Sequence, residues 1–512
     1  MDMKLKMPAV FSNHMVLQRR KHVLVWGNAE SGSKVTVSIA GQSVETSAEN
    51  GAWSVKLAPM EAGGPYEMVV TAENETISFE NVLVGEVWFA GGQSNMELEL
   101  QNSDNGKEVI KQTEDERIRF YYTPKIAQLG QELEEAEAKN AWMECKPEKT
   151  ATWSAVGYYF ARQISKALDV PVGIIGCNWG GTIADNWVSR ESLLKHKELA
   201  HLVEEYDELV ANQNHEEYLK ELAEYKEYYA VWEKKVNEIY AKQPDIAWED
   251  VLSIAGENRW PGPMGPLHEY RPAGLYECMV KRVAPFTLGG ALYYQGESDE
   301  NNHTIYRSLL QNLIEEWRGL WQDDELPFAI VQLPVFATDE KTGYGWGAIR
   351  KAQQDVYKTI KNTSLTTIID CGEQFNIHPT DKETVGNRVA ANVLKDIFGF
   401  ADSNGNGPCA VDYVPDSVHD HAGIKVLFAG AEEGFYQNGE RLLEQAYDIE
   451  GFEIAGADGV YVPAKVIVAE NALFLYSEQI EKPEKVRYGH KNYFHVELKD
   501  VKGYPVMPFW LG

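Results

Sequence analysis

The chain has 512 residues, of which 44% are hydrophobic and 25% are charged. This length exceeds what one hydrophobic core fills, so we expect several globular domains, without an apolar run long enough to span a membrane. Acidic side chains outnumber basic ones by 78 to 48, and the formal net charge of -30 repels a phosphate backbone, which excludes nucleic acid as a partner.

The first residues lack the apolar stretch and cleavage site of a secretory signal, and the five cysteines are scattered without a CxxC pair. These features predict a cytoplasmic protein with reduced thiols, no disulfide framework and no metal site. The sequence does not indicate an oligomeric state.

Residues 1–80 contain short alternating runs, such as Val-Leu-Val-Trp at 23–26 and Lys-Val-Thr-Val-Ser-Ile at 34–39, separated by turns rich in Gly, Asn and Glu. This pattern predicts an N-terminal β-sandwich.

Between residues 81 and 400, apolar strands alternate with stretches of helical period, which is typical of an α/β domain with a parallel, doubly wound sheet. The predicted strands are 82–90, 172–178, 289–294, 328–333 and 365–369, and the predicted helices are 158–168, 305–320, 348–360 and 382–397.

A segment rich in Glu, Lys, Tyr and Ala at 191–260 has a helical period and contains no Pro or Gly between Glu191 and Lys242. It predicts a helical insertion on the flank of the α/β domain, with its charges on a solvated face. Residues 401–512 return to short strands, and we expect them to form a C-terminal β-rich domain.

Four unusual segments follow predicted strands of the α/β domain. They are Gly-Gly-Gln-Ser-Asn-Met at 91–96, Trp-Gly-Gly-Thr at 179–182, Gln-Gly-Glu-Ser at 295–298 and Asn-Ile-His-Pro at 376–379. In open α/β sheets, ligands bind outside the carboxyl ends of the strands, so we expect these segments to meet.

Together, the segments supply the parts that acyl transfer requires. Ser94 is the candidate nucleophile and His378 the candidate base. The N–H groups of Ser94 and of Gly180 or Gly181, with the side-chain amide of Gln295, are candidates for an oxyanion hole, each donor being worth about 3–4 kcal/mol at the transition state. Taken alone, Ser-Asn-Met-Glu at 94–97 also fits a helix capping box.

Further motifs occur along nearly the whole chain, among them Phe-Ser-Asn-His-Met-Val-Leu-Gln at 11–18, Val-Gly-Glu-Val-Trp at 84–88, Ser-Ala-Val-Gly-Tyr at 154–158 and Val-Gly-Asn-Arg at 385–388. With the serine segment, they resemble the sialate O-acetylesterase family of the Ser-Gly-Asn-His hydrolases. The resemblance implies a flavodoxin-like, three-layer parallel-sheet hydrolase domain with flanking β-sandwich domains. It also implies an acetylated sugar as substrate, Ser94 and His378 as catalytic residues, and no cofactor.

Two positions depart from the family pattern. The family often has Asp-Ile-His-Pro where this chain has Asn376, and an amide cannot stabilise an imidazolium by charge. Either Glu373 or Asp370 supplies the third member, or Ser94 and His378 act as a dyad. The second departure is Glu-Cys at 277–278, where the family pattern has Asn-Gly, which indicates an altered substrate preference.

Other polar and aromatic residues near these segments are candidates for substrate binding. Trp side chains can stack on a sugar ring, and an arginine can pair with the carboxylate of a sialic acid. The candidates are Gln93, Asn95, Glu297, Trp187, Arg271 and Trp346, together with Trp260 and Arg350.

Three alternatives stay open at this point. One is an enzyme that acts on neutral acetylated xylo- or manno-oligosaccharides, which need no basic pocket. Glu297 and Glu373 could instead serve as the two carboxylates of a glycosidase, although this leaves the serine segment unexplained. The chain could also be a carbohydrate-binding protein with an inactive hydrolase core.

Overall fold

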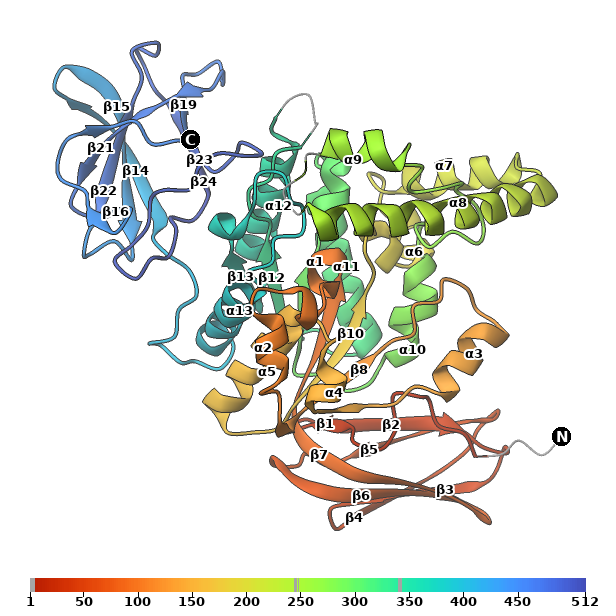
Figure 1. Cartoon of the computed structure of the whole chain (residues 1–512). Coiled ribbons are helices and arrows are strands. Elements are labelled where there is room, and N and C mark those ends of the chain that lie inside the picture. Colours follow the sequence, from red (N-terminus) through yellow and green to blue (C-terminus); the bar gives the residue numbers. More distant parts are fainter. Residues whose placement is uncertain (1–4, 244–245, 247, 339–342) are drawn as a thin grey trace.

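The computed structural model describes residues 5–243, 246, 248–338 and 343–512. It has a mixed α/β fold in which β-rich regions lie at opposite ends of a central sheet flanked by helices (Figure 1). None of the helices within these ranges is long and apolar enough to cross a lipid bilayer.

The N-terminal strands have the alternating burial that their sequence predicts, with β5 exposing every second side chain. β2 pairs with β5, whereas β3 pairs with β4 and β6. The strands are β1 (Val16–Gln18), β2 (Val23–Asn28), β3 (Lys34–Ile39), β4 (Gln42–Ser47), β5 (Ala52–Leu57), β6 (Gly63–Ala72) and β7 (Glu75–Gly92).

β7 connects the N-terminal strands to the central sheet. Its first half pairs with β6, and its second half lies at the middle of the central sheet between β10 and β11. The predicted boundary at residue 80 therefore falls inside one continuous strand. This continuity places the end of β7, and the segment that follows it, at the centre of the molecule.

The central sheet has the order β13-β12-β11-β7-β10-β8-β9, and every neighbouring pair except β8–β9 is parallel. Five of these strands match the predicted apolar runs. β8 and β9 were not predicted, because β8 begins with three charged residues and β9 has only three residues. The strands are β8 (Asp115–Tyr122), β9 (Met143–Cys145), β10 (Val172–Asn178), β11 (Gly290–Tyr294), β12 (Phe328–Gln332) and β13 (Thr363–Thr367).

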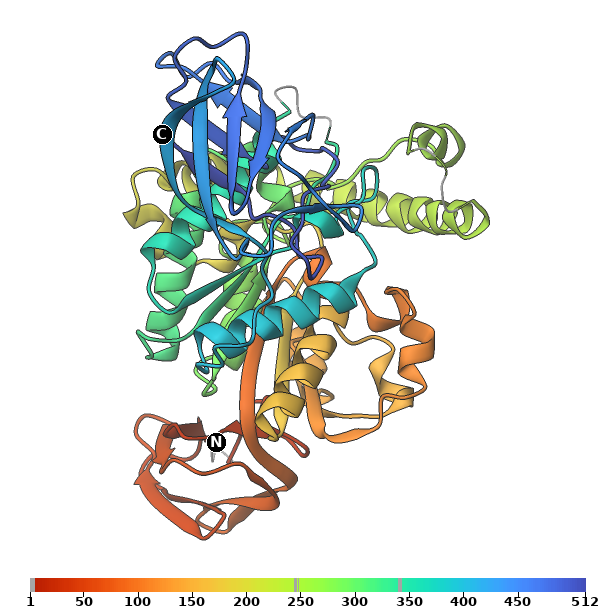
Figure 2. The same cartoon turned by 90° about the vertical axis from the view of Figure 1, so that its left-hand side faces the viewer.

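Helices cover both faces of this sheet. Trp88 and Phe89 are neighbours on β7 and point to opposite faces. The Trp88 ring packs 5.1 Å from Phe160 on α5, and the Phe89 ring packs 4.9 Å from Trp317 on α11. α13 packs beside α5, and α12 beside α11 (Figure 2). These helices are α5 (Ala155–Leu168), α11 (Tyr306–Trp321), α12 (Gly345–Thr359) and α13 (Lys382–Asp396).

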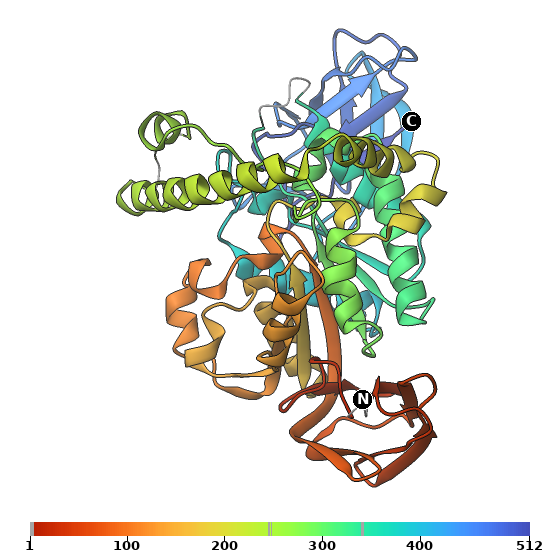
Figure 3. The same cartoon turned by 90° about the vertical axis from the view of Figure 1, so that its right-hand side faces the viewer.

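The segment at 191–260 contributes helices on the flank of the molecule. α8 is the longest of them and projects away from the body of the protein (Figure 3). The helices are α6 (Arg190–Lys195), α7 (Ala200–Ala211), α8 (His215–Lys242) and α9 (Trp248–Ala255). Shorter helices elsewhere are α1 (Ser94–Glu97), α2 (Gly106–Ile110), α3 (Gln131–Ala138), α4 (Pro147–Thr150) and α10 (Lys281–Val283).

The C-terminal strands form a five-stranded sheet, a four-stranded sheet and a small two-stranded ribbon. The five-stranded sheet contains β14 (Cys409–Val418), β15 (His421–Ala429), β18 (Ala446–Tyr447), β21 (Lys465–Ala469) and β22 (Ala472–Tyr476). The four-stranded sheet contains β19 (Phe452–Ala455), β20 (Val462–Pro463), β23 (Lys485–Tyr488) and β24 (Phe509–Leu511), and the ribbon contains β16 (Tyr436–Gln437) and β17 (Glu440–Arg441).

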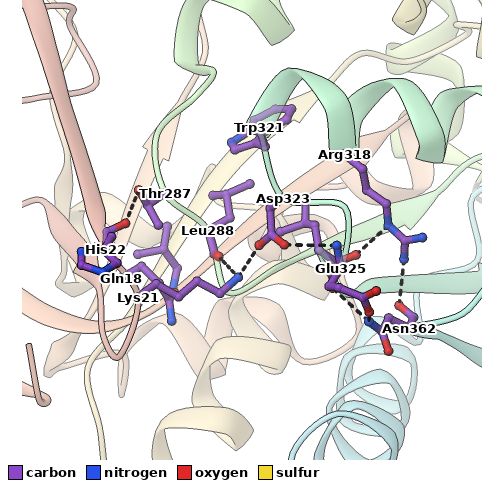
Figure 4. A network of polar contacts seen from close by, with 12 residues as sticks. Gln18, Lys21, His22, Thr287, Leu288, Arg318, Trp321, Asp323, Glu325 and Asn362 are labelled. Atoms are coloured by element: carbon purple, nitrogen blue, oxygen red, sulfur yellow. Dashed lines mark hydrogen bonds and ion pairs between the residues drawn. The ribbon is translucent and has the colours of Figure 1, made fainter. Parts of the chain in front are cut away.

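A polar network attaches the N-terminal strands to the central sheet (Figure 4). The Lys21 ammonium lies 2.7 Å from the Asp323 carboxylate and donates to the carbonyl of Leu288 at 2.9 Å. Arg318 donates to the carbonyls of Leu326 and Asn362. Leu288, Leu326 and Asn362 lie one or two residues before β11, β12 and β13, so the network lies at the amino ends of these strands and leaves their carboxyl ends for a ligand.

Candidate active site

Ser94 lies where β7 turns sharply into α1. Gly92 has a φ of 134°, and a Cβ atom there would lie 2.1 Å from the carbonyl oxygen of Tyr294, so only glycine fits. Gln93 donates its N–H to that same carbonyl at 3.2 Å. Among the described residues, the N–H of Ser94 has no hydrogen-bond acceptor. The turn therefore presents both the hydroxyl and the N–H of Ser94 to a ligand.

The His378 side chain reaches this serine from the loop before α13. Its Nε2 lies 2.7 Å from the Ser94 Oγ, within hydrogen-bond distance. The His378 N–H donates to the side-chain oxygen of Asn376 at 3.0 Å, which holds the loop in a tight turn. With the Nδ1 tautomer, Nε2 can accept the proton of the serine hydroxyl.

The surroundings of His378 favour the neutral imidazole. Desolvation, followed by the positive charge of Lys382, lowers the pKa of His378 to about 4, whereas Glu97 acts in the opposite direction. The residue nevertheless keeps an exposed edge at the protein surface. A neutral imidazole at pH 7 is the protonation state that a general base requires.

Neither predicted third member bonds to the His378 ring. Asp370 is bound by Arg388 at 2.6 Å and by Lys499 at 3.0 Å, and these cations lower its pKa although its burial alone would raise it. Asp370 is therefore a structural ion-pair residue, and its prediction as the third member is wrong. Glu373 accepts from the Asn376 side chain at 3.2 Å, so it contacts the loop rather than the imidazole.

Two of the four predicted oxyanion donors are already occupied. The N–H of Gly180 donates to the Glu97 carboxylate at 2.7 Å. The side-chain amide of Gln295 is buried and donates to Asp299 at 2.5 Å. It is therefore not available to an oxyanion, and its predicted role is wrong. The N–H groups of Ser94 and Gly181 have no acceptor within the described part of the chain. These two are the donors that remain for an oxyanion.

A buried polar network lies next to the Ser94–His378 pair. The Asn95 side chain donates to Glu297 at 2.7 Å and accepts from the Lys382 ammonium at 2.6 Å. Desolvation raises the pKa of Glu297 to about 6 and lowers that of Lys382 to about 8. Asn95 and Glu297 were predicted as substrate contacts, and their burial rules this out.

Lys382 was not singled out from the sequence, although one signal was present. It is the first residue of α13, a position where the helix dipole disfavours a cation. A lysine in that position, four residues after a candidate catalytic histidine, indicates a nearby negative or polar partner.

Two of the predicted substrate contacts, Trp187 and Trp346, are buried inside the protein. The indole N–H of Trp187 donates to Thr182, and that of Trp346 donates to the carbonyl of Pro334, with both rings buried. The predicted stacking roles of Trp187 and Trp346 are therefore wrong, because neither ring is accessible.

The remaining polar candidates are also engaged within the protein. Gln93 is buried and donates to the Ser298 hydroxyl at 3.1 Å. Arg271 donates to the carbonyl of His268 at 2.9 Å, and Arg350 is fully buried, with bonds to the carbonyls of Gly489 and Pro334. The expected roles of Gln93 and Arg350 in binding substrate are wrong. The Arg271 guanidinium is held by the backbone.

Trp260 is an exposed aromatic side chain beside the loop of residues 179–182, which carries the Gly181 N–H. Its indole is 43% exposed and its N–H donates to the Tyr270 hydroxyl at 3.3 Å. That hydroxyl donates to the carbonyl of Gly180 at 3.0 Å. A Cβ atom at Gly181 would lie 2.8 Å from the Trp260 ring, and one at Gly180 would lie 3.3 Å from the Cβ of Ser94. The aromatic pair therefore packs directly on the loop that borders the nucleophile.

Comparisons with known proteins converge on one chemistry. The family model described as "Carbohydrate esterase, sialic acid-specific acetylesterase" matches residues 263–395. Sialate O-acetylesterase of Mus musculus is 26% identical over 434 residues, covering 77% of this chain and 74% of that protein. The Homo sapiens protein of the same name is 26% identical, covering 78% of this chain and 72% of its own length. The structure of a carbohydrate acetylesterase from Xanthomonas citri matches with a TM-score of 0.76 and 25% identity, covering 99% of this chain and 100% of that one.

Proposed function

Since the chain belongs to the carbohydrate esterase family of the sialic acid-specific acetylesterases and is a carboxylic-ester hydrolase, we propose that it removes O-acetyl groups from sialic acid through an acyl-serine intermediate. Ser94 is the nucleophile and His378 the base in this proposal. The observation that carries it is the 2.7 Å contact between Ser94 Oγ and His378 Nε2 at the carboxyl end of the central sheet.

The reaction begins when His378 Nε2 accepts the hydroxyl proton of Ser94 and the Oγ attacks the acetyl carbonyl carbon. The N–H groups of Ser94 and Gly181 stabilise the oxyanion of the tetrahedral intermediate. The imidazolium then returns the proton to the sugar oxygen as the C–O bond breaks. Water, deprotonated by His378, attacks the acyl-serine in the second half and releases acetate.

In this proposal the site works with a Ser-His pair, because none of the carboxylates in the described part of the chain bonds to Nδ1 of His378. The negative charge that favours the imidazolium comes from Glu97, which also accepts the N–H of Gly180. Glu97 is shared with Lys125 in an ion pair, so its effect on His378 is weakened. This arrangement gives a weaker base than a triad carboxylate would, without changing the order of steps.

The sugar ring has a binding surface in Trp260 and Tyr270. An exposed indole next to Gly181 lets a pyranose stack while its acetyl group points at Ser94. Burial of the apolar face of the sugar ring against the indole contributes about 25 cal/mol for each Å² removed from water.

Neutral acetylated xylo- or manno-oligosaccharides are the second candidate substrates. The two arginines expected to pair with a sialate carboxylate, Arg271 and Arg350, donate to backbone carbonyls instead. This observation favours a sugar without a carboxylate, whereas the family membership favours sialic acid.

The deciding experiment measures acetate release from O-acetylated sialic acids and from acetylated xylo- and manno-oligosaccharides under the same conditions. A kcat/KM at least tenfold higher for the sialic acids supports the first proposal, and the reverse ratio replaces it with the second. The Ser94→Ala variant is the control, and any ester turnover that it retains at the wild-type rate contradicts Ser94 as nucleophile.

We also propose that the central sheet has a flavodoxin-like arrangement. The strands that carry the chemistry, β10-β7-β11-β12-β13, follow the order 2-1-3-4-5 of flavodoxin-like sheets, which supports such an arrangement with β8 and β9 added at one edge. The domain limits at residues 80 and 400 and the cytoplasmic location stay predictions.

A further inference from the structure

Three buried polar side chains lie between the nucleophile turn and the base loop. Asn95, Glu297 and Lys382 are exposed by 1%, 4% and 0%, and they come from the start of α1, the short 3-10 helix that follows β11 and the start of α13. The Asn95 side chain is the centre of the group, because its amide donates to Glu297 and its oxygen accepts from Lys382.

Asn95 also touches the loop that carries the base. Its amide donates to the carbonyl of Ile377 at 2.9 Å, and Ile377 immediately precedes His378. Asn95 itself immediately follows Ser94. One side chain thus joins the residue after the nucleophile to the residue before the base, and Lys382 holds that side chain from the helix that follows the loop.

Burial of these three side chains lowers the stability of the folded state. The second carboxylate oxygen of Glu297 is buried and has no hydrogen-bond partner among the described residues. Lys382 is buried at a helix N-terminus, where the dipole repels it. Buried ionic groups seldom stabilise a fold more than apolar side chains of the same size would, so stability alone does not account for them.

We propose that Asn95, Glu297 and Lys382 are positioning residues that fix the His378 imidazole against the Ser94 hydroxyl. They take over the orienting part of the role of a triad carboxylate, but they act through the backbone of the base loop rather than through Nδ1 of the ring. This inference rests on the serine esterase function proposed above.

The same group sets the charge around the base. Within the described ranges, Lys382 and Glu97 are the charged residues that act on the His378 imidazole, in opposite directions. Glu297 in turn partly neutralises Lys382. Removal of the Lys382 charge therefore shifts the acidic limb of the activity profile to higher pH, an effect that a merely structural role does not produce.

The test compares the Asn95→Ala variant with Asn392→Ala as a matched control. Asn392 is another buried asparagine of the α/β region, which lies about 15 Å along α13 from Lys382 and bonds to Leu365 and Thr366 of β13 rather than to the base loop. The readouts are kcat and KM for 4-nitrophenyl acetate, the rate at which a fluorophosphonate labels the active serine, and the Tm.

We expect Asn95→Ala to lower kcat and the labelling rate about 100-fold, as a misplacement of about 1 Å does, with KM changed less than about twofold. Asn392→Ala should lose a similar amount of thermal stability and keep its kcat. Glu297→Gln keeps an acceptor for Asn95 and should retain at least about ten times the kcat of Glu297→Leu.

Two results overturn the inference. One is a folded Asn95→Ala variant whose kcat lies within about threefold of the wild type, and the other is an equal loss in Asn392→Ala. If Asn95→Ala does not fold, two other measurements decide: the kcat of Glu297→Gln against that of Glu297→Leu, and the pH profile of Lys382→Met. The inference is rejected if the two Glu297 variants have equal kcat and the acidic limb of the Lys382→Met profile does not shift. A wild-type protein that neither hydrolyses esters nor labels with the fluorophosphonate refutes the proposed function rather than this inference.

Discussion

The surroundings of His378 predict that the esterase keeps its activity in mildly acidic solution. Desolvation and Lys382 lower the pKa of this histidine to about 4, from an ordinary value of 6.5. Because the depressed value favours the neutral base, activity is lost only as the pH falls through the pKa of the folded protein. The acidic limb of kcat/KM reports this pKa in the free enzyme.

The size of the effect follows from the two values. At pH 5.5, a histidine with a pKa of 6.5 is about 9% neutral, whereas one with a pKa of 4 is about 97% neutral. Water at the exposed edge of the ring offsets part of the desolvation, so we expect the midpoint of the limb to lie above 4 but below about 5.5. The enzyme should then retain more than about half of its maximal kcat/KM at pH 5.5.

The assay measures acetate release in stopped samples between pH 4 and 8, because the absorbance of nitrophenol itself changes across this range. Each sample is returned to pH 7.5 and assayed again, which separates titration of the base from irreversible inactivation. A limb with its midpoint at 6.5 or above would refute the reasoning, since it would mean that the environment of His378 does not favour the neutral form.

Three further outcomes follow from the structure. Trp260→Ala should raise KM for an acetylated sugar about fivefold, since the loss of about 40 Å² of apolar contact costs about 1 kcal/mol, and should leave the KM for 4-nitrophenyl acetate unchanged, which steady-state kinetics on both substrates checks. The pKa of Glu297 is raised from 4.5 to about 6, so its ionisation costs the folded state about 2 kcal/mol at pH 7, and stability is lost as the pH rises from about 4.5 to 6. Glu297→Gln should flatten this part of a Tm–pH curve, and a wild-type slope in the variant would contradict it. Arg350→Met leaves buried carbonyls without a donor and should destabilise the protein by about 3 kcal/mol or more in urea unfolding, without a change in the KM for any acetylated sugar.

Most strands of the sheet could be predicted because they are apolar runs bounded by polar segments, whereas β13, with the sequence Thr-Ser-Leu-Thr-Thr, begins two residues before the predicted range. β8 could not, since its first three residues are charged and only the residues after them are continuously buried. The proximity of Ser94 and His378 followed from a topological rule alone, because both segments come after strands of one parallel sheet.

The partners of individual side chains could not be predicted in the same way. Gln295 has the right chemistry for an oxyanion donor, but Asp299, one turn further along, binds its amide. Asn95 and Lys382 are 287 positions apart, and no local pattern links them. The topology of the sheet determines which segments meet, whereas competition among neighbouring polar groups determines which donors stay free for a ligand.

Asn376 provides a last test of why this site lacks a triad acid. Its side-chain oxygen accepts the backbone N–H of His378, and its amide donates to Glu373 at 3.2 Å. An aspartate there would keep the first bond but would place two carboxylates side by side, and it would still face the backbone rather than Nδ1. We therefore expect Asn376→Asp to change kcat by less than about tenfold, far below the roughly 10⁴-fold effect of the aspartate in a serine protease triad. Adding Glu373→Gln should relieve the repulsion and restore the Tm without further acceleration. If either variant instead turned over at least about 100 times faster than the wild type, the loop would be able to present a carboxylate to the ring, and the positioning network would not be what orients the base.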